Sequence, residues 1–107
     1  MKFREIVQEM KTGAFDELRE ENENYFEAVI MKGEIDKFVA RLEKFFGSPA
    51  WPSKEKMTPK MKNEIKEFGG IIPGQTLYFS EQDNEVVFAM LWPWKDGQRT
   101  TIKIVKK

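Results

Sequence analysis

The sequence contains neither cysteine nor histidine. Without cysteine there is no disulfide, no thiol nucleophile and no zinc-thiolate site. Without histidine, the Ser-His-Asp and Cys-His catalytic arrangements and most transition-metal sites are excluded as well. Catalysis would have to use carboxylates, lysines, tyrosines or hydroxyl groups. We therefore predict a protein with no resident metal and no cofactor.

An excess of one charge sign and long apolar segments are missing too. Eighteen lysines and arginines balance eighteen aspartates and glutamates, so the net charge is zero. No overall field then draws the chain toward nucleic acid or an acidic membrane. The first residues mix charged with apolar positions, and no apolar run is long enough to span a bilayer. This pattern predicts neither a secretory signal nor a membrane span, and a cytoplasmic location.

The length and apolar content of the chain suit one folded unit. The sequence has 107 residues, 40% of them hydrophobic, with nine Phe, three Trp and two Tyr. That is enough apolar material for one core and too short a chain for two. We predict a single domain over residues 1–107.

Three segments carry apolar residues at helical spacing. The first begins at Phe3 and continues past Gly13 to Leu18, the second spans residues 34–46, and the third starts at Thr58 and ends at Gly69. Thr58 followed by Pro59 is typical of a helix start, and glycine after position 46 is typical of a helix end.

The first helix is expected to end in an acidic stretch, Asp16, Glu17, Glu20, Glu21 and Glu23. Clustered carboxylates can bind a divalent ion, but the glycine-turned loop of an EF-hand is absent. We therefore interpret this stretch as a solvated helix end.

Four segments are expected to be strands: residues 25–31, 75–80, 86–94 and 99–105. The last three are joined by hairpin loops, so they form a meander, and residues 25–31 can extend either of its edges. The element order is α-β-α-α-β-β-β. The sequence predicts a two-layer α+β domain, with a four-stranded, largely antiparallel sheet and helices packed mainly on one face.

Residues 86–94 read VVFAMLWPW, with no charge in nine positions. A strand buried on one face alternates apolar with polar residues, so an unbroken run indicates a strand covered on both faces. One helical layer would cover only one of them. We expect the second cover to come at least in part from another molecule.

Trp92 and Trp94 lie at the end of this run and point the same way in an extended strand. Indoles are frequent anchors of binding sites, although the two rings could instead close the core beneath the hairpin. The function this predicts is a non-catalytic binding domain with an aromatic surface, to which Trp51 and Tyr78 are possible neighbours. The partner would be a protein or a second copy of the chain, forming a homodimer.

Two alternative functions use other residues. Basic side chains beside an aromatic could bind single-stranded nucleic acid weakly, although nearby carboxylates oppose them. The residues are Lys54, Lys56, Lys60, Lys62, Lys66, Arg99 and Lys103. A catalytic site could instead combine Tyr78 with Glu81, Asp83 and Glu85 around the first hairpin.

Overall fold

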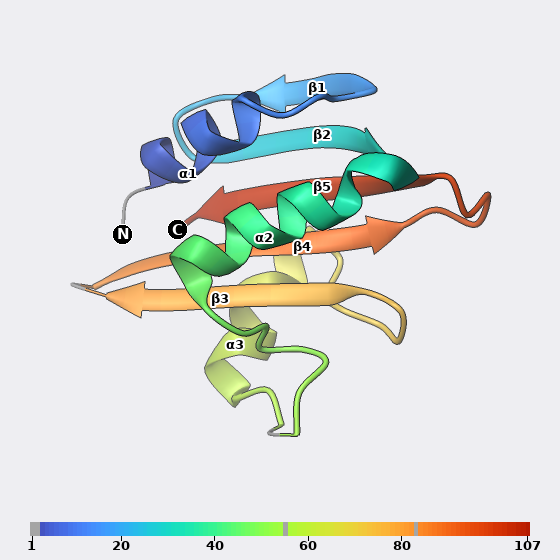
Figure 1. Ribbon diagram of the computed structural model, residues 1–107. Coiled ribbons are helices and arrows are strands. Elements are labelled where there is room, and N and C mark those ends of the chain that lie inside the picture. Colours follow the sequence, from blue (N-terminus) through green and yellow to red (C-terminus); the bar gives the residue numbers. More distant parts are fainter. Residues whose placement is uncertain (1–2, 55, 83) are drawn as a thin grey trace.

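The fold is built on five antiparallel strands in the spatial order β1-β2-β5-β4-β3 (Figure 1). The computed structural model describes residues 3–54, 56–82 and 84–107, so Asp83 of the proposed catalytic group lies outside the described residues. The strands are β1 (Glu17–Glu21), β2 (Tyr25–Met31), β3 (Thr76–Gln82), β4 (Glu85–Pro93) and β5 (Arg99–Lys106). The predicted meander of β3, β4 and β5 is confirmed, and the sheet has five strands rather than four.

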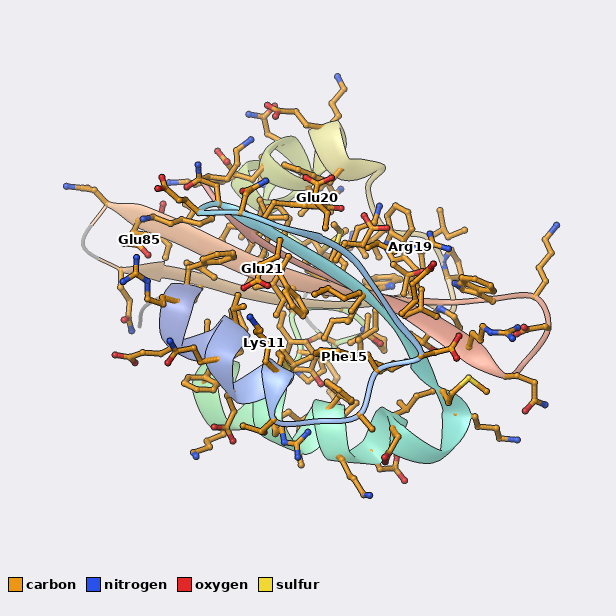
Figure 2. The ribbon with its side chains drawn as sticks, turned by 90° about the horizontal axis from the view of Figure 1, so that it is seen from above. Lys11, Phe15, Arg19, Glu20, Glu21 and Glu85 are labelled. Carbon is orange, nitrogen blue, oxygen red and sulfur yellow. The ribbon has the colours of Figure 1, made fainter. Side chains whose placement is uncertain are left out.

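Three α-helices cover the sheet from two sides. They are α1 (Phe3–Lys11), α2 (Ile35–Phe46) and α3 (Pro59–Ile65), with 3-10 turns at Lys32–Glu34 and Lys66–Phe68. Figures 1 and 2 show α1 and α2 on one face of the sheet and α3 on the other. None of the helices within the described residues is long and apolar enough to cross a lipid bilayer.

The predicted end of the second helix and the predicted start of the third are confirmed by their caps, whereas α3 ends at Ile65 and continues to Phe68 as a 3-10 turn. Gly47 follows α2 with a positive φ of 76°, a conformation that glycine adopts without steric cost. The Thr58 hydroxyl accepts a hydrogen bond from the Met61 amide at 3.2 Å, and Pro59 occupies the first helical position.

The acidic stretch is an edge strand, not the end of a helix. α1 stops at Lys11, and a side chain at Gly13 would come within 2.6 Å of the Phe38 ring. Phe15 then packs between Phe26 and Phe38, with ring centres 5.8 and 5.9 Å away. These contacts carry the chain to the sheet, where β1 pairs with β2. The stretch is solvated as predicted, because every residue of β1 is exposed.

The position of β2, which the sequence left open, is between β1 and β5. Its register with β5 runs from Tyr25 opposite Val105 to Met31 opposite Arg99. β5 is therefore the middle strand of the sheet, and β4 lies between β5 and β3.

Two hydrophobic clusters lie on opposite faces of the sheet. Val87, Ala89 and Leu91 of β4 face α1 and α2, in a cluster that also contains Ile6, Met10, Phe26, Phe38, Leu42, Tyr78, Ile102 and Ile104. Val86, Phe88 and Met90 face α3, in a cluster that also contains Ile65, Leu77 and Val105, with Trp51, Met57, Phe68 and Trp92 packed against it.

The apolar run of β4 is thus covered by its own chain on both faces. Residues from Val86 to Leu91 are all buried, because residues 50–71 with α3 supply the second cover. The expected two-layer architecture was incomplete, and the expectation that this run exceeds what one molecule can bury was wrong. Only Trp92 and the residues after it remain partly exposed.

Candidate interaction surface

The α3-bearing face of the sheet continues beyond the cluster under α3 into an open, polar and aromatic area. We call this area the indole face. It consists of Arg19 of β1, Glu27 of β2, Arg99, Thr101 and Lys103 of β5, Trp92 at the end of β4 and Trp94 directly after β4. Strand register brings these residues together: Lys103 lies opposite Glu27, and Thr101 lies opposite Trp92. In Figure 2, Arg19 lies on the α3 side of the sheet, whereas Phe15 lies on the side of α1 and α2.

Trp92 is half-buried at the boundary between the second cluster and the indole face. The rim of its ring packs against Gly69, since a Cβ there would lie 2.6 Å from the Trp92 Cη2. The Lys103 ammonium lies 3.6 Å from the centre of the same ring. The indole Nε1 is buried and has no hydrogen-bond partner among the described residues. Trp92 is thus held in place by packing and by a cation-π contact.

Trp94 is also half-buried, and it is held by a hydrogen bond. Its Nε1 donates to the Thr101 hydroxyl at 2.8 Å, and its backbone amide donates to the Arg99 carbonyl at 2.8 Å. The guanidinium carbons of Arg19 and Arg99 lie 5.3 and 5.5 Å from its ring centre. The ring is therefore fixed in orientation and accompanied by two cations.

The turn after Trp94 forms as the sequence predicts. Gly97 adopts a positive φ of 69°. The Asp96 carboxylate accepts hydrogen bonds from the Gln98 and Arg99 amides, and these bonds, with the Arg99 guanidinium, lower the pKa of Asp96. This hairpin places Arg99 beside Trp94.

The two arginines of the indole face are neutralised within the chain. Arg19 pairs with Glu17 at 2.9 Å and Glu27 at 3.6 Å. Arg99 pairs with Asp16 at 3.2 Å and Asp96 at 2.9 Å. The face and its border therefore carry both signs in close alternation.

Lys103 differs from the two arginines. No carboxylate among the described residues lies within 4.0 Å of its ammonium, which rests on the Trp92 ring. Burial lowers the pKa of Lys103, Glu27 partly offsets that effect, and Arg19 adds to it.

Tyr25 and Glu27 link the indole face to the α3 cluster. The Tyr25 hydroxyl donates to a Glu27 carboxylate oxygen at 2.5 Å, and the Tyr25 ring stacks on Phe68 with ring centres 6.0 Å apart. Because Glu27 also pairs with Arg19, the carboxylate joins the packed half of this face to the open half.

Tyr78 and Trp51, the other two predicted surface residues, are not part of the indole face. Tyr78 is only 1% exposed and lies on the opposite side of the sheet, where its hydroxyl donates to Glu43 of α2 at 3.0 Å. Burial and the Glu43 carboxylate raise the pKa of Tyr78. Trp51 forms a bridge with Leu77 at the outer side of β3 and is half-buried in the second cluster.

The proposed catalytic group is not assembled around the first hairpin. Tyr78 and Glu81 have opposite parity on β3, so their side chains emerge from opposite faces of the sheet. Glu81 forms an ion pair with Lys60, and Glu85 lies across from Gln82 at the hairpin. Tyr78 contacts Glu43 instead, a residue that the sequence did not link to it.

The residues proposed to bind nucleic acid have varied surroundings. Lys60 pairs with Glu81, Arg99 pairs with two aspartates, and Lys103 rests on Trp92. The others, Lys54, Lys56, Lys62 and Lys66, are exposed before, on and directly after α3. Near the indoles the basic charge is thus largely compensated.

The acidic stretch does not form a metal site in the described part of the chain, where no group of three or more carboxylates converges. Glu21 pairs with Lys11, and both are labelled in Figure 2. Glu17 pairs with Arg19, and Asp16 pairs with Arg99. The carboxylates are spread along an edge strand and paired with cations.

Sequence reasoning missed Arg19 and Glu27 as members of the surface. Arg19 was assigned to a helix end, so its approach to Trp94 could not be foreseen. Glu27 carried a usable signal, because in a strand over residues 25–31 it shares a face with Tyr25. Which strand would face it was not predictable while β2 could join either edge.

Comparison of the chain with protein families, with curated proteins and with solved structures finds no significant match.

Proposed function

We propose that this protein is a non-catalytic interaction module, and that a second copy of the same chain covers its indole face. The observation that carries the proposal is the pair of half-exposed indoles, Trp92 and Trp94, each fixed by its own chain and each accompanied by cations.

Fixed aromatic side chains suit an interface. An indole buries a large area, and a ring already held in place loses little further freedom on binding. Trp94 is held by Thr101, and Trp92 is held between Gly69 and Lys103. Tryptophan, tyrosine and arginine are also the residue types enriched at interface centres, and this face provides all three with Tyr25 at its margin.

The charges favour a second copy over nucleic acid. Arg19 and Arg99 are bridged by four carboxylates, so the face offers no excess of positive charge to phosphates. A surface that carries both signs can be complementary to itself in a two-fold dimer. The chain has no net charge, so two copies do not repel each other at long range.

Sedimentation equilibrium over the micromolar to millimolar range tests the proposal. We expect the wild-type chain to approach the mass of a dimer. Lys103→Glu places a carboxylate beside Glu27 and should weaken the dimer at least tenfold, whereas Lys106→Glu makes the same charge change at an exposed position on the same strand and should not. Trp94→Ala should weaken it as well.

A monomer at every concentration would contradict the proposal. Equal effects of Lys103→Glu and Lys106→Glu would show that net charge, and not the indole face, controls association. Nucleic acid is tested on the same samples with labelled single-stranded oligonucleotides at low salt. Binding that Lys103→Glu abolishes while the wild-type chain stays monomeric would replace the second copy with nucleic acid as the partner.

A further inference from the structure

The face of the sheet that carries α1 and α2 has a cavity, which the proposed function does not use. It has a volume of about 310 Å³ and is lined by residues of the first half of α2 and of the end of the sheet where β4 turns into β5. Its apolar wall is formed by Ile35 and Val39 of α2 with Leu91 and Pro93 of β4. Volumes of this size are at the lower end of small-molecule sites, and about half as much space already holds benzene.

The most deeply buried polar residue in this wall is Thr100. The residue is only 3% exposed, no side-chain hydrogen bond of Thr100 is found among the described residues, and its hydroxyl is not one of the enclosed unpaired groups, so the oxygen is reached from the cavity. Thr101, its neighbour on the opposite face, is buried to a similar degree, but its hydroxyl accepts the Trp94 indole N-H. A hydroxyl that lines the cavity and has no partner in the described part of the chain is available to a bound molecule.

The cations near the cavity indicate which ligand charge it suits, because they are either paired with carboxylates or exposed at the mouth. Arg99 lies at its margin, but its guanidinium is paired with Asp16 and Asp96. Lys32 is exposed at the mouth. The inner wall therefore offers hydroxyl groups, from Thr100 and the half-buried Thr76, and no free charge.

We propose that this cavity binds a small, neutral and mainly apolar molecule that carries one carbonyl or hydroxyl oxygen. The apolar part lies against Ile35, Val39 and Leu91, and the oxygen forms a hydrogen bond with the Thr100 hydroxyl. Thr100 lies on the side of the sheet opposite the indole face, but Trp94 and Arg99 of that face also line the margin of the cavity, so the two proposals are tested with different variants.

Cyclohexanone is a suitable probe, because it combines a compact apolar ring with one acceptor oxygen. Methyl resonances of Ile35, Val39 and Leu91 in the full chain should shift on titration, with a Kd on the order of 1 mM. Thr100→Val should weaken binding about three- to tenfold by removing the hydroxyl, and Thr100→Ser should retain it. Thr12→Val makes the same change at the end of α1, where the hydroxyl bonds to the Glu9 carbonyl and does not line the cavity, and should leave the affinity unaltered.

A second variant fills the space without touching the hydroxyl. Val39→Phe places a ring in the cavity from a half-buried position of α2 and should abolish the methyl shifts. Unchanged methyl resonances at saturating cyclohexanone in the wild-type chain would overturn the proposal. So would shifts that persist in Val39→Phe, or an affinity that is the same in Thr100→Val and Thr100→Ser.

Discussion

The Lys103 ammonium lies 3.6 Å from the centre of the Trp92 ring, while the rim of that ring rests on Gly69. One side of the contact is a flexible side chain and the other is backbone. The ring can therefore yield toward Lys103 but not toward the turn after α3. Trp92 connects the α3 cover of the second cluster to the indole face. A substitution at Gly69 or at Lys103 should therefore affect the packing of that cover and the position of the indole.

Gly69→Ala should destabilise the protein more than Gly70→Ala. Both glycines have positive φ, 100° and 68°, so both substitutions carry the cost of a left-handed alanine, about 1–2 kcal/mol. At Gly69 the added Cβ also meets Trp92, whereas nothing lies within 4 Å at Gly70. Overpacking adds about 1–3 kcal/mol at Gly69 only. Urea unfolding measures both, and equal losses would contradict the contact with Trp92.

Trp94 and Thr101 should be energetically coupled. The 2.8 Å hydrogen bond between them is partly buried, so removing either partner leaves a polar group unpaired. In a double-mutant cycle of Trp94→Phe and Thr101→Val, we expect a coupling free energy of about 1 kcal/mol. The cycle is measured by urea unfolding. Additive effects within about 0.3 kcal/mol would show that the bond contributes nothing to stability.

The predictable elements of this fold are those with local signals. α2 has one apolar face and a glycine after its last residue, and α3 has a threonine cap followed by proline. The β4-β5 hairpin has Asp96 and Gly97 at its turn. Each signal lies within a few residues of the feature that it determines.

β1 has no local signal of this kind. Its residues, ELREE, are all exposed, so no alternation of apolar and polar residues marks a strand. β1 pairs with β2, and Phe15 before it packs on β2 and α2, so the contacts that place this strand are not marked by its own residues. The second cover of β4 was hidden for a similar reason, because α3 could have packed on either face.

The candidate surface was predictable to the same extent. Trp92 and Trp94 follow from the sequence, because they end an apolar strand and share a face. Their cations do not, since Arg19 comes from the unpredicted strand and Lys103 comes from a register that pairing alone determines. Tyr78 was grouped with the wrong neighbours because its contact with Glu43 depends on which face α2 covers.

Stability should fall above about pH 10 because of the two tyrosines. Burial and the Glu27 and Glu43 carboxylates raise the pKa values of Tyr25 and Tyr78 in the folded chain. An unfolded tyrosine ionises near pH 10, so from there upward the unfolded state binds fewer protons than the folded one. The stabilisation is complete below pH 10 and is lost as the pH rises toward the folded-state pKa values.

Urea unfolding between pH 8 and 11, with tyrosinate absorbance recorded in parallel, tests this expectation. The double variant Tyr25→Phe and Tyr78→Phe should show a flatter decline in the free energy of unfolding over that range than the wild-type chain. Tyrosinate absorbance that appears near pH 10 while the wild-type chain is still folded would contradict the raised pKa values.

Thr58→Ala should loosen the cover of the second cluster. The Thr58 hydroxyl accepts the Met61 amide hydrogen bond that caps α3, and loss of such a cap costs about 1 kcal/mol. Thr12→Ala is a matched control, because the Thr12 hydroxyl donates to the Glu9 carbonyl at the end of α1 and caps no free amide. Its cost should be smaller.

The region in which Thr58→Ala loses protection from hydrogen exchange distinguishes a local effect of the cap from a general loss of stability. α3 packs Ile65 against the cluster that contains Phe88 and Met90, and the chain after it reaches Trp92 at Gly69. In Thr58→Ala, amide hydrogen exchange should accelerate most across residues 61–70. The β2 and β5 amides should accelerate only as much as the loss in the global free energy of unfolding requires. Equal acceleration throughout the sheet would mean that α3 and the sheet unfold as one unit. In that case Trp92 would owe its position to the whole fold and not to the cap of a short helix.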